Sequence, residues 1–171
     1  WCRIFASLFP TAVFSHNFKL LFDSLGPFLG VEPSPDARAG YISAAGTLAT
    51  VLYIAGQRVP AQIVLDRIRE ISKNLSKLEC DPWGFILGCE ACHEELCIKL
   101  PYSYWVHNHE SVAAFKESGN RRFQVIIGAN EGKALSDLGR QEEAIAVLRG
   151  CLGLGMQIRD NLPTTIAQVY L

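Results

Sequence analysis

Apolar residues recur at intervals of three and four through most of this chain, and this spacing restricts the fold more than any other feature. One stripe consists of Val64, Ile68, Ile71, Leu75 and Leu78, and another of Ala144, Ile145, Leu148, Cys151 and Leu152. Such intervals place side chains on one face of an α-helix. Sustained apolar–polar alternation and the Asn-Gly or Asp-Gly turns of β-hairpins do not occur in the sequence, so it predicts an all-α protein.

Signals for helix starts and ends divide the chain into about eight helices with short connections. Gly56, Gly119 and Gly139 stand where helices should end. Asp81-Pro82 is a typical helix start. The predicted helices cover residues 2–13, 17–29, 36–55, 60–77, 82–98, 102–118, 121–138 and 141–157, and a ninth begins near Pro163. Short connections favour antiparallel neighbours.

A repeat emerges when the helical pairs are aligned on their turns. Gly56 and Gly139 are each followed five positions later by an alanine, and they lie 83 residues apart, or two units of about 41–42. The turn of the intermediate unit falls near 98–101. Helical pairs of fixed length are typical of α-solenoids. We therefore expect one domain with hairpins at 36–80, 81–119 and 120–158, a divergent hairpin at 1–35 and the start of a further unit at 159–171.

The segment GANEGKALSDLGRQEEAIAVLRGCL, residues 128–152, resembles a tetratricopeptide (TPR) unit. Gly132, the turn at Gly139, Ala144, and Leu148 followed by Cys151 match the small and large packing positions of that family. The match implies that Gly132 and Ala144 let two helices approach closely while Leu148 fills the space to the next hairpin. Two departures are Glu131, where the family has a large apolar residue, and the lack of aromatic residues at its usual aromatic positions.

The wider run from DPWGF through FKESGNRRF to AIAVLRG is similar to the repeat arrays of large bacterial regulators. These include the C-terminal arms of multidomain Ser/Thr kinases with ATPase modules, and MalT-like activators. The resemblance covers residues 81–171, and the hairpin at 36–80 shares only its turn, Ala61 and Leu65. It implies a right-handed superhelix of stacked hairpins, and we expect the chain to be part of a longer protein.

The function implied by this resemblance is protein–protein interaction rather than catalysis. We expect a scaffold module of a bacterial cytoplasmic signalling or regulatory protein, without an enzymatic activity or cofactor of its own. The first helix of each hairpin would line a concave groove that receives a peptide or a partner helix. In the repeat register, the groove-facing candidates are Tyr53, Cys92, Glu95, Lys133, Ser136 and Asp137.

The stretch GCEACHEELC suggests a different chemistry. Cys89-x-x-Cys92-His93 has the spacing that attaches a c-type haem, and residues 89–97 hold four potential zinc ligands. In a helix, however, Cys89 and Cys92 share an apolar face with Phe85, and buried cysteine packs as a small hydrophobe. A metal- or haem-binding helical protein using Cys89, Cys92 and His93 therefore remains the alternative reading.

Two histidines follow this stretch closely. His107 and His109 could in principle complete a metal site with Cys89 and His93. Their place inside a predicted helix favours a structural role in hydrogen bonds between helices.

Net charge and composition argue against nucleic acid and a membrane as partners. The formal net charge is −1, which provides no basic field for nucleic acid. Residues 39–57 carry no charge, but glycine, serine and threonine dilute this run, which predicts a buried helix rather than a membrane span. The six cysteines are too sparse for a disulfide-rich secreted domain, and this favours a reduced cytoplasmic setting.

Overall fold

The computed structural model describes residues 26–73 and 80–171, and every regular element in these two stretches is helical. The elements are α3 (Pro35–Ile54), α4 (Arg58–Ser72), α5 (Cys80–His93), the π-helix η1 (Glu94–Ile98), α6 (Pro101–Ser118), α7 (Arg121–Asp137), α8 (Gln141–Ile158) and α9 (Asn161–Tyr170). The all-α prediction is therefore confirmed for the described residues. The helices predicted at 2–13 and 17–29 lie outside them, except that residues 26–29 are helical.

Predicted and observed helix starts from α3 onward differ by no more than two residues. The largest difference in backbone form lies at the end of the helix predicted at 82–98, where the last turn widens into η1 and closes at Lys99 with φ +63°. This places a helix end where the repeat predicts one. At the end of α4, the predicted residues 74–77 fall outside the described part of the chain.

The three predicted turn glycines all end helices in the left-handed conformation. Their φ angles are +74° at Gly56, +75° at Gly119 and +77° at Gly139. After each glycine, the next backbone N–H donates to the carbonyl five residues earlier, with N–O distances of 2.8–2.9 Å. This is the Schellman arrangement. It favours glycine because a residue with a Cβ atom is sterically strained at positive φ. Gly56 and Gly139 lie within predicted hairpins, whereas Gly119 joins α6 to α7, which the prediction assigns to different hairpins. The same turn therefore occurs within and between the predicted hairpins, and it does not by itself mark a hairpin.

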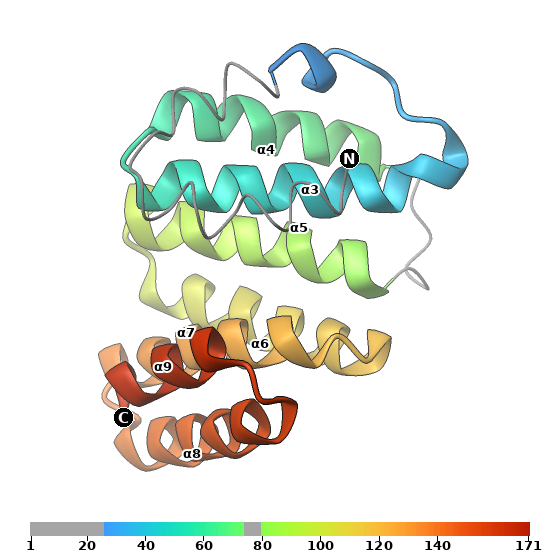
Figure 1. Cartoon of the computed structure of the whole chain (residues 1–171). Coiled ribbons are helices and arrows are strands. Elements are labelled where there is room, and N and C mark those ends of the chain that lie inside the picture. The colour runs from blue at the N-terminus through green and yellow to red at the C-terminus, as the bar shows by residue number, and fades with distance from the viewer. Residues whose placement is uncertain (1–25, 74–79) are drawn as a thin grey trace.

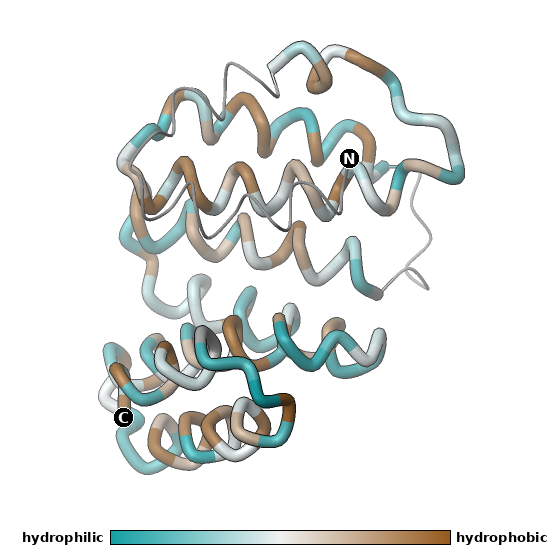
Figure 2. The backbone as a smooth tube through the Cα atoms, viewed as in Figure 1, coloured by the Kyte–Doolittle hydropathy of each residue, from teal (hydrophilic) through white to brown (hydrophobic). Residues whose placement is uncertain are grey.

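Each helix packs mainly on elements one or two positions away along the chain (Figure 1). Helix α3 contacts α4 and α5, α6 lies against α5 and α7, and α7 contacts α8 and α9. The elements succeed one another from α4 and α3 at one end of the view to α8 at the other. Hydrophobic and hydrophilic stretches alternate along the helices (Figure 2), as expected when one side of each helix is buried.

The apolar core has two main parts. The larger lies between α3, α4 and α5, and the smaller between α7, α8 and α9. Two small clusters around Phe115 and Tyr104 connect α5, α6 and α7 between them. The uncharged run at 39–57 contributes α3 to the larger core, which confirms that it is a buried helix. Among the described residues, no helix is long and apolar enough to cross a membrane.

The packing positions named from the tetratricopeptide resemblance lie at helix contacts. A Cβ atom built on Gly132 would lie 2.6 Å from Leu148 Cγ, so α7 and α8 meet at a point that admits only glycine without rearrangement. Ala144 of α8 and Ala61 of α4, the residue matched with it on the turn glycines, are both buried. The close approach expected at Gly132 is therefore confirmed. Leu148, which was expected to fill the space to the next hairpin, is the residue that meets Gly132 of the preceding helix.

Candidate partner-binding face

Three of the six predicted groove residues meet in one ionic cluster. Lys133 Nζ lies 2.7 Å from Glu95 Oε1 and 2.7 Å from Asp137 Oδ2. Residues 133 and 137 are one turn apart on α7, and Glu95 reaches them from η1, which follows α5. The side chains of Glu95, Lys133 and Asp137 are 28%, 31% and 48% exposed, so water and a partner can reach all three.

Two tyrosines from other helices complete this group. The Lys133 ammonium lies 5.5 Å from the centre of the Tyr104 ring, which is buried on α6. Tyr170 of α9 is partly exposed beside them, and the charges of Glu95, Lys133 and Asp137 act on its hydroxyl. We call Glu95, Tyr104, Lys133, Asp137 and Tyr170 the Lys133 cluster, which draws on η1, α6, α7 and α9.

The protonation states in the Lys133 cluster follow from burial and hydrogen bonding. Burial opposes the charge of Lys133, but hydrogen bonds to Asp137 and Glu95 outweigh this effect and raise the pKa of the ammonium. Burial also raises the pKa of the Tyr104 hydroxyl, and a hydrogen bond to Glu95 raises it further. At neutral pH the cluster therefore holds a charged lysine and neutral tyrosines.

The other predicted groove residues lie elsewhere. Tyr53 and Cys92 are only 2% and 7% exposed and belong to the core between α3, α4 and α5. They were expected on an open groove, but helix packing turns both side chains inward. Ser136 is half-buried at the end of α7, and its hydroxyl donates to Gln141 Oε1 at 3.1 Å, which braces the turn into α8.

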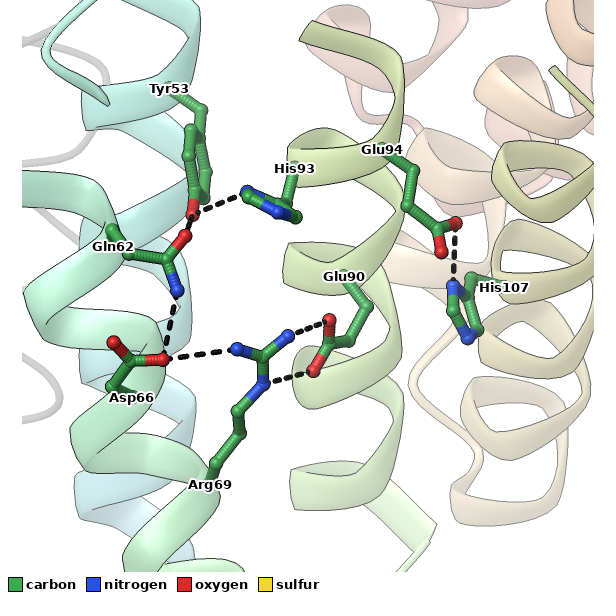
Figure 3. A network of polar contacts seen from close by, with 8 residues as sticks. All are labelled: Tyr53, Gln62, Asp66, Arg69, Glu90, His93, Glu94 and His107. Atoms are coloured by element: carbon green, nitrogen blue, oxygen red, sulfur yellow. Dashed lines mark hydrogen bonds and ion pairs between the residues drawn. The ribbon is translucent and has the colours of Figure 1, made fainter. Parts of the chain in front are cut away.

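Tyr53 instead belongs to a polar network that joins α3, α4 and α5 (Figure 3). Its hydroxyl donates to Gln62 Oε1 at 3.0 Å and lies 3.1 Å from His93 Nδ1. The Gln62 amide nitrogen donates to Asp66 at 2.8 Å, which fixes the orientation of this amide. Because the tyrosine has a single hydroxyl hydrogen, we assign the second hydrogen bond to a proton on His93 Nδ1.

Arg69 extends this network from α4 to α5. Its guanidinium donates to both oxygens of Glu90 at 2.7 and 2.6 Å, and to Asp66 at 3.0 Å. This bidentate contact between Arg69 and Glu90 fixes the relative rotation of α4 and α5. Since Arg69 is 41% exposed, solvent screens the pair and its contribution to stability is about 1 kcal/mol or less.

The cysteines of GCEACHEELC pack as the helical spacing predicts. Cys89 and Cys92 join the core on the face of α5 that meets α3, and the Cys89 thiol donates to the Gly46 carbonyl at 2.9 Å. Burial raises the pKa of Cys89 to about 12 and also raises that of Cys92. Thiolate is the form that binds metals and attacks electrophiles, so these surroundings disfavour both reactions.

Nor do the neighbouring side chains form a metal site with these thiols. Within residues 26–73 and 80–171, no three His, Cys, Asp or Glu side chains are grouped so that they could hold a metal ion. His107 Nδ1 contacts Glu94 at 2.8 Å, and His109 Nδ1 contacts Glu131 at 2.7 Å. The structural role between helices expected for both histidines is confirmed.

Sequence reasoning missed two members of the Lys133 cluster. Tyr104 lies inside a helix whose sequence pattern does not single it out, and Tyr170 stands at the end of a helix with no charged residue. The spacing of residues within one helix cannot show that α6 and α9 meet α7 at this point. A periodic pattern gives the face of a residue on its own helix, but not the helix that covers that face.

Comparison of the chain with protein-family models, curated proteins and solved structures gave no match. The Lys133 cluster must therefore be interpreted from its own chemistry. Its lysine is charged and ion-paired, which makes it a poor nucleophile, and its tyrosine hydroxyls are neutral. Such a group is suited to recognising charged side chains.

Proposed function

We propose that this chain is an interaction module built of stacked antiparallel helical hairpins, a right-handed superhelix of the tetratricopeptide type. In this arrangement α3, α5, α7 and α9 are the first helices of successive hairpins. Two features support the proposal: each helix packs mainly on elements one or two positions away along the chain, and Gly132 meets Leu148 where the repeat has its small and large positions. Its partner would be a peptide or a helix bound across the first helices.

The observation that carries this proposal is the composition of the Lys133 cluster. Glu95 belongs to η1, which follows α5, while Lys133 and Asp137 belong to α7 and Tyr170 belongs to α9, so three successive hairpins of this arrangement contribute to one partly exposed surface. A surface shared by several repeats is how solenoids bind extended partners. The resemblance to bacterial regulators adds the proposal that the module serves as a scaffold in a cytoplasmic signalling protein, without catalysis of its own.

A selected peptide library provides the test. A random peptide library displayed on phage is panned on the purified chain, and the affinity of selected peptides is measured by biolayer interferometry. We expect Asp137→Arg, which reverses a charge within the first-helix surface, to weaken binding at least about tenfold. The matched control is Arg149→Asp on the exposed side of α8, which should leave affinity unchanged. Equal effects of the two substitutions would contradict the proposed binding surface.

A further inference from the structure

We infer that the Lys133 cluster is a binding site for a cationic side chain of the partner, lysine or arginine, and that Lys133 occupies this site in the free protein. The inference rests on the proposed function and adds the chemistry of the group that is recognised. Lys133 would leave the site as the partner's cation enters it, and would return when the partner dissociates.

The contacts of the Lys133 ammonium are those that recognise a cation. Two carboxylates contact it at 2.7 Å each, and the Tyr104 ring lies 5.5 Å below it. Carboxylate oxygens and the face of an aromatic ring are the two kinds of group that attract an ammonium or guanidinium in proteins. The groups around the ammonium come from η1, α6 and α7, so three packed elements form the site.

The charge balance favours a cation over an anion as the incoming group. Two carboxylates face one ammonium, so the cluster carries an excess of one negative charge, and removing the lysine would leave two unpaired carboxylates. An anionic ligand would have to pair with Lys133 while facing Glu95 and Asp137, and like charges that close repel each other.

Exchange of one cation for another is feasible because Lys133 is not locked in place. Its side chain is 31% exposed, and its flexible four-carbon stem allows the ammonium to move into water without disturbing α7. The exchange conserves the number of ion pairs in the site. The internal lysine therefore acts as a competitor, and a competitor lowers the apparent affinity for the partner's cation.

The test uses hexalysine, acetylated and amidated at its ends, as the cationic probe in calorimetric titrations at low salt. Replacing the internal competitor by Lys133→Met should tighten hexalysine binding about fivefold to tenfold, since two partly exposed ion pairs no longer compete. Arg149→Met removes the same charge from the exposed side of α8 and is the matched control. Equal affinities of the Lys133→Met and Arg149→Met variants would overturn the inference.

Substitution of the carboxylates gives an independent result. Glu95→Gln and Asp137→Asn, each made in the Lys133→Met background, should weaken hexalysine binding, whereas Glu142→Gln on the exposed side of α8 should not. Circular dichroism verifies folding, and Lys133→Gln replaces Lys133→Met if the latter is unfolded. Binding of hexaglutamate that depends on Lys133 would instead identify an anion site and refute the inference.

The outcomes also separate this inference from the proposed function. Phage-selected peptides that lose affinity with Asp137→Arg but contain no lysine or arginine would support the first-helix surface and exclude the cation site. Peptides that bind equally to Asp137→Arg and to the control would contradict the surface itself.

Discussion

His109 of α6 covers the carboxylate of Glu131 on α7, with His109 Nδ1 and Glu131 Oε1 2.7 Å apart. The Glu131 side chain is only 8% exposed, at the position where a tetratricopeptide unit has a large apolar residue. Trp105 stacks on the histidine at a centroid distance of 5.7 Å, and Arg140 lies over Trp105. The buried carboxylate of Glu131 therefore has a polar partner, His109, and an aromatic ring behind that partner on the neighbouring helix.

Removal of His109 should destabilise the fold because it leaves the buried carboxylate without this partner. We expect His109→Ala to lower the free energy of unfolding by about 1–3 kcal/mol. Adding Glu131→Leu to that variant should restore most of the loss, since an apolar residue then fills the buried position. Urea denaturation of both single variants and the double variant measures the coupling. Additive effects of the two substitutions would show that the pair does not interact.

Substitution of Gly132 by alanine should destabilise the protein, whereas substitution of Gly150 by alanine should not. In Gly132→Ala the new methyl would lie 2.6 Å from Leu148 Cγ, so α7 and α8 must move apart, at a cost of about 1–3 kcal/mol in unfolding free energy. A methyl group on Gly150 of α8 would meet no side chain and no other helix within 4 Å, and Gly150→Ala should stabilise the helix by about 0.5–1 kcal/mol. Thermal unfolding of the two variants should give opposite shifts in Tm.

Lys99 and Gly139 both end helices at positive φ, but only one of them is glycine. The φ angle is +63° at Lys99 and +77° at Gly139. We expect Lys99→Gly to raise the free energy of unfolding and Gly139→Ala to lower it, each by about 1 kcal/mol. Chemical denaturation measures both changes. A destabilising Lys99→Gly would indicate that the lysine side chain makes a contribution larger than the backbone strain.

The buried thiols should make the protein less stable in alkali. Burial raises the pKa of Cys89 from 9.0 to about 12. Between these values the unfolded chain loses a proton that the native state retains, so the free energy of unfolding falls as pH rises from about 9 to about 12. Cys89→Ala should flatten this dependence, whereas Cys97→Ala, at a partly exposed site, serves as the control. Urea unfolding at pH 8, 9 and 10 measures the slopes.

The same burial predicts an order of thiol reactivity. A thiol-reactive disulfide reagent at pH 8 should modify Cys97 before Cys89 and Cys92, because the latter two are buried. Mass spectrometry of peptides from the briefly treated native protein identifies the modified positions. Rapid labelling of Cys89 would show that the contact between α3 and α5 opens readily.

Local sequence was sufficient to define the helices of the described region. The spacing of Val64, Ile68 and Ile71 gives α4 its buried face, and all three are buried. Gly56, Gly119 and Gly139 end helices because positive φ strongly favours glycine. These features depend on residues within one or two helical turns of each other, so a linear pattern contains the information.

The Lys133 cluster shows what local sequence did not contain. The repeat register predicted Glu95, Lys133 and Asp137 for one face, but it also placed Tyr53 and Cys92 there, and both are buried. Whether a helical position is covered depends on how neighbouring helices cross it. The sequence alone therefore determined where helices begin, end and turn, because hydrogen bonds within a helix and backbone sterics are local. Only the tertiary structure decided which side chains meet, because contacts between η1, α6, α7 and α9 depend on the packing of whole helices.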